Sequence, residues 1–148
     1  MDYDYSEYFR LLYERVNAAV KVRYREVSLG EWQPELNKCH DNVDFWVKHH
    51  GNALAVRGWI FWLPDETGRC TFKAHSIVQE NGTFVDITPI DGNTSREGLY
   101  FLTHPGTEAE FLAMKVVCAD VLYPPITCKE WHESQSPAGY NEEMDVDF

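Results

Sequence analysis

Positively charged residues are scarce in this sequence. Its 148 residues contain 13 Lys and Arg against 24 Asp and Glu, which gives a formal net charge of −11 at pH 7. Proteins that bind nucleic acid or anionic membranes use clustered Lys and Arg to contact phosphates. The composition therefore argues against both kinds of partner, and a protein that binds this acidic surface would itself be basic.

Long apolar runs are missing as well. No segment approaches the roughly 20 apolar residues that a membrane-spanning helix needs. The first residues, MDYDYSEYF, have no basic region followed by an apolar run. We therefore expect no signal peptide and a cytoplasmic location.

Cysteine is infrequent, and its spacing does not fit the common zinc modules. The four cysteines are Cys39, Cys70, Cys118 and Cys128. In the cytoplasm we expect them to be free thiols. None forms the close pair found in zinc knuckles and ribbons. We expect no metal ion and no other cofactor.

The sequence also has no internal repeats, low-complexity tracts or linkers. With 44% hydrophobic and 14% aromatic residues, it has the composition of a folded domain. A chain of this length is sufficient for one hydrophobic core and short for two. We assign residues 1–140 to a single α+β domain and residues 141–148 to an acidic, disordered tail.

Two helices are predicted in the first third of the chain. Residues 5–22 repeat apolar side chains on one face, and Asp4 and Glu7 have the spacing of a capping box. Residues 38–50 form the second predicted helix, with Asn37 as its N-cap.

Strands are predicted downstream of these helices. Residues 53–63 are almost continuously apolar and rich in β-branched and aromatic side chains, as in a buried strand. Shorter strands are predicted at residues 71–79, 83–88 and 99–104. Residues 110–122 follow a capping-box signal but have a β-branched centre, so they fit either a helix or a strand. This order predicts an α+β domain whose helices pack on an antiparallel sheet.

The clearest local signal is the hairpin turn Asn81-Gly82, since both residues tolerate the positive φ of a tight type I′ turn. If they are the central pair, Ile77 lies opposite Asp86, and His75 becomes a diagonal neighbour of Asp86 on the same face. Their β-carbons would be roughly 7 Å apart, which allows an imidazole–carboxylate hydrogen bond. The carboxylate would fix the tautomer of the ring and stabilise its protonated form, as in a general-base pair.

A base of this kind needs a nucleophile, and Cys39 is the best candidate. It lies in the first turn of a predicted helix, where the helix dipole and free amide hydrogens favour the thiolate. The other three cysteines have no comparable position.

The order Cys39, His75, Asp86 resembles the transglutaminase-like branch of the papain-like cysteine fold. The wider pattern is CHDNV at residues 39–43, GW at 58–59 and DITP at 86–89. It is similar to uncharacterised small bacterial and phage proteins and covers about a third of the chain. The sequence departs from the family in three ways: Ile77 replaces an aromatic residue, the spacing between His75 and Asp86 is short, and His40 follows the cysteine.

The resemblance implies cysteine-dependent acyl chemistry: hydrolysis, deamidation or acyl transfer on a peptide, a protein or a small amide or ester. Cys39 would attack the acyl carbon, His75 would move the proton, and Asp86 would hold the imidazole. The Cys39 backbone amide would help to bind the oxyanion. The remaining residues expected to shape the substrate pocket are Asn42, Trp59 and Thr88.

Other hypotheses fit parts of the same pattern. Cys39 alone is typical of a buried structural thiol. Cys39, His40, His75 and Asp86 include zinc-ligand types, although adjacent residues on a helix point about 100° apart. A third hypothesis is a non-catalytic acidic interaction protein or inhibitor, encoded for example by a phage, with N-terminal tyrosines as interface anchors.

Overall fold

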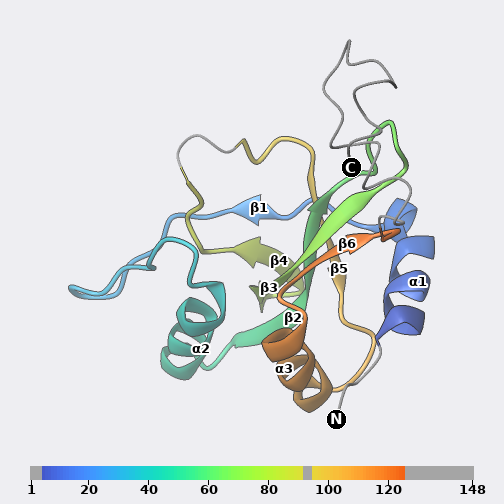
Figure 1. Cartoon of the computed structure of the whole chain (residues 1–148). Coiled ribbons are helices and arrows are strands. Elements are labelled where there is room, and N and C mark those ends of the chain that lie inside the picture. The colour runs from blue at the N-terminus through green and yellow to red at the C-terminus, as the bar shows by residue number, and fades with distance from the viewer. Residues whose placement is uncertain (1–4, 92–94, 126–148) are drawn as a thin grey trace, which may run out of the picture.

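The computed structural model describes residues 5–91 and 95–125 of the chain (Figure 1). The described residues form an α+β unit with three α-helices and a mixed sheet. The elements in chain order are α1 (Ser6–Glu14), a 3₁₀ turn (Val16–Ala18), β1 (Arg23–Tyr24), α2 (Cys39–His49), β2 (Ala53–Trp62), β3 (Cys70–Glu80), β4 (Thr83–Asp86), β5 (Leu99–Thr103), α3 (Glu108–Val117) and β6 (Asp120–Tyr123). None of the helices described here is long and apolar enough to cross a membrane.

Strand β3 organises the sheet. The described strands follow the order β1-β4-β3-β2-β5, and β6 also pairs with β3. One edge of β3 pairs with β2. The other edge is shared, because β6 pairs with residues 70–73 and β4 with residues 78–80. Residues 74–77 of β3 lie in the gap between these two partners, and the candidate site is built there.

The expectation of a purely antiparallel sheet is wrong at one strand. Arg23 and Tyr24 form β1, which runs parallel to β4, whereas the other pairs of strands are antiparallel. The first helix accordingly ends at Glu14 instead of residue 22. The chain becomes extended after the 3₁₀ turn, and Val20 exchanges backbone hydrogen bonds with Phe101 of β5. Pairing with the sheet thus overrides the helical pattern of residues 15–22. Asp4, the expected capping residue, lies outside the described residues.

The second helix lies where it was predicted, but its start differs. Asn37 has a φ of 60°, and Lys38 occupies the N-cap position without a side-chain capping bond. Asn37 is therefore not the N-cap. Asparagine tolerates the left-handed conformation, which redirects the chain into the helix at Cys39.

Residues 110–122, which fitted either a helix or a strand, contain most of helix α3 and most of strand β6. The Thr107 hydroxyl accepts a hydrogen bond from the Glu110 amide at 3.2 Å and caps α3, as the capping box predicted. The helix ends at Cys118, and the chain then enters β6. Cys128 and the predicted tail, 141–148, lie outside the described residues.

The helices pack on one face of the sheet. The β2 and β3 residues in the two core clusters include Trp59, Phe72 and Val78, which share a face by strand alternation. Helices α1 and α3 contribute to the first cluster and α2 to the second. The side chains of His75 and Ile77 point to the opposite face of the sheet. The sheet therefore separates the imidazole from the main core.

Candidate active site

The hairpin brings His75 and Asp86 into contact. Asn81 and Gly82 have φ values of 53° and 77°, and Val78 pairs with Val85, as the predicted turn requires. The His75 Nε2 donates to Asp86 Oδ2 over 2.8 Å. Both side chains are buried, with 8% and 2% exposed. The structure therefore shows the hydrogen bond that we predicted from the pairing of residues across the two-residue turn.

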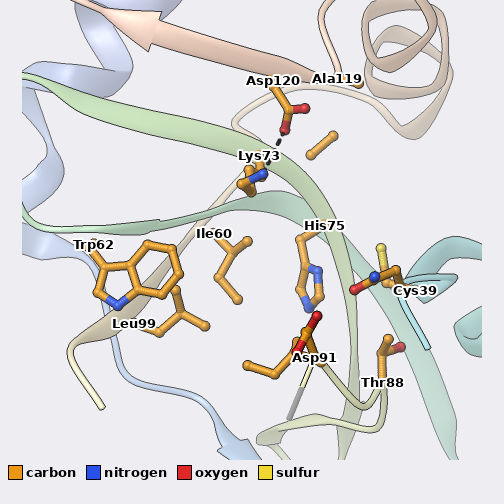
Figure 2. Close-up of a pocket in the computed structure, with 13 residues that line it drawn as sticks. Cys39, Ile60, Trp62, Lys73, His75, Thr88, Asp91, Leu99, Ala119 and Asp120 are labelled. Atoms are coloured by element: carbon orange, nitrogen blue, oxygen red, sulfur yellow. Dashed lines mark ion pairs between the residues drawn. The ribbon is translucent and has the colours of Figure 1, made fainter. Parts of the chain in front are cut away.

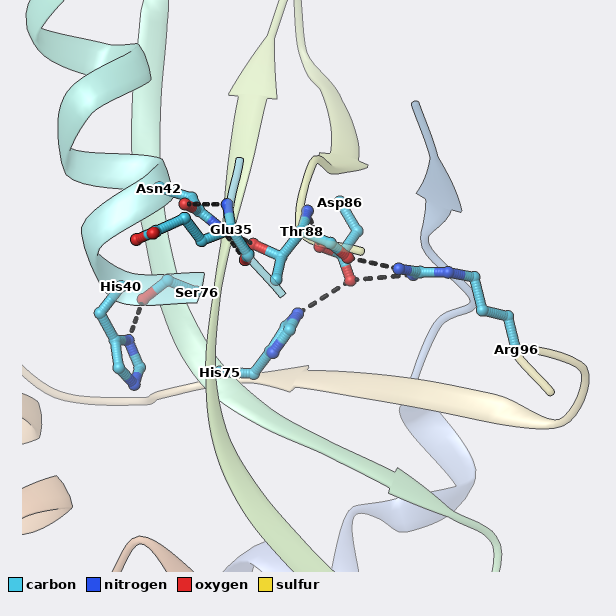
Figure 3. A network of polar contacts seen from close by, with 8 residues as sticks. All are labelled: Glu35, His40, Asn42, His75, Ser76, Asp86, Thr88 and Arg96. Carbon is cyan, nitrogen blue, oxygen red and sulfur yellow. Dashed lines mark hydrogen bonds and ion pairs between the residues drawn. The ribbon is translucent and has the colours of Figure 1, made fainter. Parts of the chain in front are cut away.

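Asp86 is held by donors besides the imidazole. The Thr88 amide donates to Oδ1 at 3.0 Å, and Arg96 Nη1 donates to Oδ2 at 3.2 Å (Figure 3). Burial raises the pKa of Asp86, but the hydrogen bond and charge of His75, the Thr88 amide and Arg96 lower it further, so the net pKa is lowered. The carboxylate is thus fixed in its ionised form and in its orientation toward the ring.

Cys39 lies against the other side of the same imidazole, at the wall of a cavity (Figure 2). Since His75 Nε2 is bonded to Asp86, Nδ1 is the ring nitrogen left for the sulfur. Burial raises the pKa of Cys39, whereas hydrogen bonds and positive charge from His40 and His75 lower it to about 6. Burial lowers the pKa of His75, but Asp86 and Cys39 raise it to about 10. Between these two values the pair is a thiolate and an imidazolium.

A second imidazole, that of His40, also contacts the sulfur. His40 Nδ1 lies 2.6 Å from the hydroxyl of Ser76 (Figure 3). The same hydroxyl accepts a hydrogen bond from Arg57 Nη1 at 2.8 Å. Ser76 is fully buried, and its single proton is best used as a donor to His40 Nδ1. With Nδ1 accepting from Ser76, the His40 ring carries a proton on Nε2.

Arg57 anchors this second network. Its guanidinium forms ion pairs with Asp44 of α2 at 2.6 Å and with Glu108 of α3 at 2.8 Å. The His40 ring packs edge-on against Phe111 of α3, with centroids 5.9 Å apart. His40 is therefore held between two helices and the central strand.

A cavity of about 470 Å³ opens beside Cys39 and His75 (Figure 2). Its walls come from β2, β3, β5, the start of α2 and the segment before it, the segment after β4, and the start of β6. The other lining residues are Asn37, Ile60, Trp62, Lys73, Ala74, Thr88, Ile90, Asp91, Leu99, Ala119 and Asp120.

One of the three residues expected in the pocket lines this cavity, and two do not. Thr88 is a wall residue. Asn42 is buried behind the wall, where its Nδ2 donates to Thr88 Oγ1 at 3.0 Å and to the Glu35 carbonyl at 2.9 Å. Its Oδ1 accepts from the Glu35 amide at 3.0 Å. Trp59 is completely buried in the core on the helix-covered face, and its Nε1 donates to Tyr8 at 2.7 Å.

Most of the lining residues were not assigned to the site from the sequence, Trp62 among them, and neither were Ser76 and Arg96. The sequence also gave no catalytic role to His40, although its position directly after Cys39 placed it beside any chemistry at the sulfur. Nothing in the sequence marks Arg96, because only tertiary structure brings it to Asp86.

The zinc hypothesis gains no support from residues 5–91 and 95–125. In this part of the chain, no group of three or more His, Cys, Asp or Glu side chains is arranged to hold a metal ion. Comparison of the chain with models of known protein families, with curated proteins and with solved structures finds no match. The functional argument therefore depends on the geometry of the site.

Proposed function

We propose that this protein is a cysteine-dependent hydrolase or acyltransferase that acts on an amide or ester. The observation that carries the proposal is one chain of contacts: a thiol at the start of a helix, an imidazole beside it, and a buried carboxylate on the far nitrogen of that imidazole. A structural thiol needs neither the imidazole nor its buried acid.

The first half of the reaction forms a thioester. The Cys39 thiolate attacks the carbonyl carbon, a carbon–sulfur bond forms, and the carbonyl oxygen becomes an oxyanion. The first amide hydrogens of α2 have no acceptor within the helix and point to this region, so they stabilise the oxyanion. The His75 imidazolium then donates its Nδ1 proton to the leaving amine or alcohol, and the bond to that group breaks.

The second half releases the acyl group. Neutral His75 takes a proton from water, an amine or an alcohol, which attacks the thioester and displaces the thiolate. Asp86 keeps Nε2 protonated and the ring in position through both halves. The acceptor decides whether the outcome is hydrolysis, deamidation or transfer.

His40 has a separate role in this proposal. Held by Ser76, it donates a hydrogen bond that stabilises the thiolate, while His75 transfers the proton of the reaction. The order of Cys39, His75 and Asp86 along a helix and a hairpin supports a transglutaminase-like, papain-like assignment. His40, Ile77 and the short spacing within the hairpin are the points at which the chain departs from that family. We place the enzyme in the cytoplasm and its substrates among peptides, proteins and small amides or esters.

The test is covalent trapping. The full chain is incubated with a library of activated amides and esters, and intact mass with peptide mapping identifies any acyl adduct. We expect an adduct on Cys39 that forms near neutral pH, decays as product is released, and is absent from Cys39→Ser. His75→Gln should slow both formation and decay, whereas Cys118→Ser should change neither. A wild-type protein whose Cys39 takes no acyl group faster than Cys118 would refute the proposal and favour a non-catalytic role.

A further inference from the structure

The cavity beside Cys39 has an apolar side. Trp62 of β2 and Leu99 of β5 are cross-strand partners, and Ile60 follows on the same face of β2. Ile90, from the segment after β4, lines the same cavity. Trp62 is 42% exposed, so a large apolar surface faces the cavity and solvent without being covered by the rest of the described chain.

The other side of the cavity is polar and carries negative charge. Lys73 is the one Lys or Arg among the lining residues of the described chain, and its ammonium pairs with Asp120 at 3.4 Å. Asp91 adds a second carboxylate. The positive charge on His75 is already compensated by Asp86 and by the thiolate. An anionic substrate would find no available cation here, and the net charge of −11 would repel it further.

The size of the cavity limits what it can hold. A volume of about 470 Å³ lies within the usual range for small-molecule sites, roughly 300–1,000 Å³. It has room for one large side chain together with the adjoining amide, but a folded protein surface would have to present such a group on an extended segment.

We propose that this cavity binds an uncharged aliphatic or aromatic group of the substrate, adjacent to the reacting carbonyl, and discriminates against carboxylates. The inference rests on the proposed function, because it assigns the substrate class of the same site. Trp62 and Leu99 supply the apolar contact, and discrimination against anions follows from the net negative charge and from the lack of an unpaired Lys or Arg among the described lining residues. The substrate is thus an amide or ester of an apolar acyl group or apolar peptide residue.

Three alkylating reagents with the same reactive carbon test this assignment: iodoacetamide, N-benzyliodoacetamide and iodoacetate. The rate of Cys39 labelling in the full chain is measured by mass spectrometry and divided by the rate of each reagent with N-acetylcysteine. We expect the normalised rate of Cys39 labelling to be about tenfold higher with the benzyl reagent than with iodoacetamide. With iodoacetate we expect it to be about tenfold lower. In Trp62→Ala the benzyl reagent and iodoacetamide should label Cys39 at the same normalised rate. Leu54→Ala, which removes another exposed apolar side chain of β2, should change nothing.

The outcomes separate the two proposals. Equal normalised rates for the three reagents, on a Cys39 that still reacts fast, would overturn the substrate class and leave the proposed function intact. Slow labelling of Cys39 by all three would count against the function. The cavity is then tested alone, by chemical-shift changes in Cys39→Ala on addition of N-benzylacetamide or acetate. Binding of the amide that is lost in Trp62→Ala supports the assignment, and absence of amide binding overturns it.

Discussion

The ionisation of Cys39 gives the sharpest test of the site, and His75→Gln is the perturbation. Glutamine removes the positive charge beside the sulfur but retains an amide donor for the buried Asp86. Thr88 and Arg96 continue to hold the carboxylate, so the variant keeps most of its local hydrogen bonding. The burial of Cys39 remains, and burial raises the pKa of a thiol.

The expected loss in the rate of Cys39 labelling follows from the pKa of the thiol in the wild type and in the variant. In the wild-type protein the pKa of Cys39 is about 6, against an ordinary value of 9.0. At pH 7 the thiolate fraction falls from about 90% to about 1% if the variant returns to the ordinary value. A thiolate of lower pKa is also less nucleophilic, by about 20-fold over this difference. The net loss of rate is therefore only about fourfold at pH 7 but about 20-fold at pH 6.

The assay is the rate of iodoacetamide labelling at Cys39 from pH 5 to 10, followed by mass spectrometry of the mapped peptides. The wild-type rate should rise with a midpoint near pH 6, because the thiolate forms as pH increases through its pKa. In His75→Gln the midpoint should move to pH 9 or above. Cys70, whose pKa burial raises to about 11, serves as the internal control in the same sample.

A wild-type midpoint that coincides with that of the variant would refute the reasoning. It would mean that the contact with His75 does not ionise the thiol, whatever the rate at any one pH. Far-ultraviolet circular dichroism of the variant must match the wild type for the comparison to count.

Three further substitutions test other parts of the structure. His40→Ala should raise the midpoint of the Cys39 profile by about one pH unit, less than His75→Gln, because one donor is lost and the charged pair remains; an unchanged midpoint would remove His40 from the site. Asn42→Ala should lower the free energy of unfolding in urea by about 2 kcal/mol, since a buried side chain loses three hydrogen bonds; a loss below about 0.5 kcal/mol would contradict this. Gly58→Ala should lower it by about 3 kcal/mol or more, because a Cβ there meets a β5 carbonyl oxygen at 2.2 Å. Gly51→Ala, with nothing within 4 Å of its Cβ, is the matched control and should melt like the wild type.

The part of the site that could be predicted from the sequence depends on short-range rules. A two-residue turn fixes both the register and the parity of its strands, so Asn81-Gly82 was enough to place His75 beside Asp86. The start of α2 was predicted to within a residue from its apolar pattern, which put Cys39 at the helix terminus. Whether these two local units meet is a tertiary question that neither pattern answers.

The parts that were missed depend on long-range contacts. Residues 15–22 have a helical pattern, but a backbone partner in β5 and a parallel neighbour in β4 draw them into the sheet. Trp59 was expected near the substrate because it follows Gly58 in the resembling pattern, yet strand alternation turns it into the core. Arg96 reaches Asp86 from a segment whose path the sequence does not define.

The lengths of the strands explain why the helix can reach the imidazole at all. Because β4 pairs only from Val78 and β6 only to Lys73, the edge of β3 between them has no strand neighbour, and the start of α2 occupies this gap. Successive strand residues point to opposite faces, and successive helix residues point about 100° apart.

The alternation of side chains along β3 matches the change of direction between adjacent residues at the start of α2. Cys39 meets His75 on one face of β3, and His40 meets Ser76 on the other. The angle that made Cys39 and His40 awkward as joint metal ligands is therefore the one that lets two adjacent residues straddle a strand. A single inserted residue between Cys39 and His40 would break this match, so we expect such an insertion to separate the thiol from one of its two imidazoles and to return its labelling midpoint toward that of an ordinary cysteine.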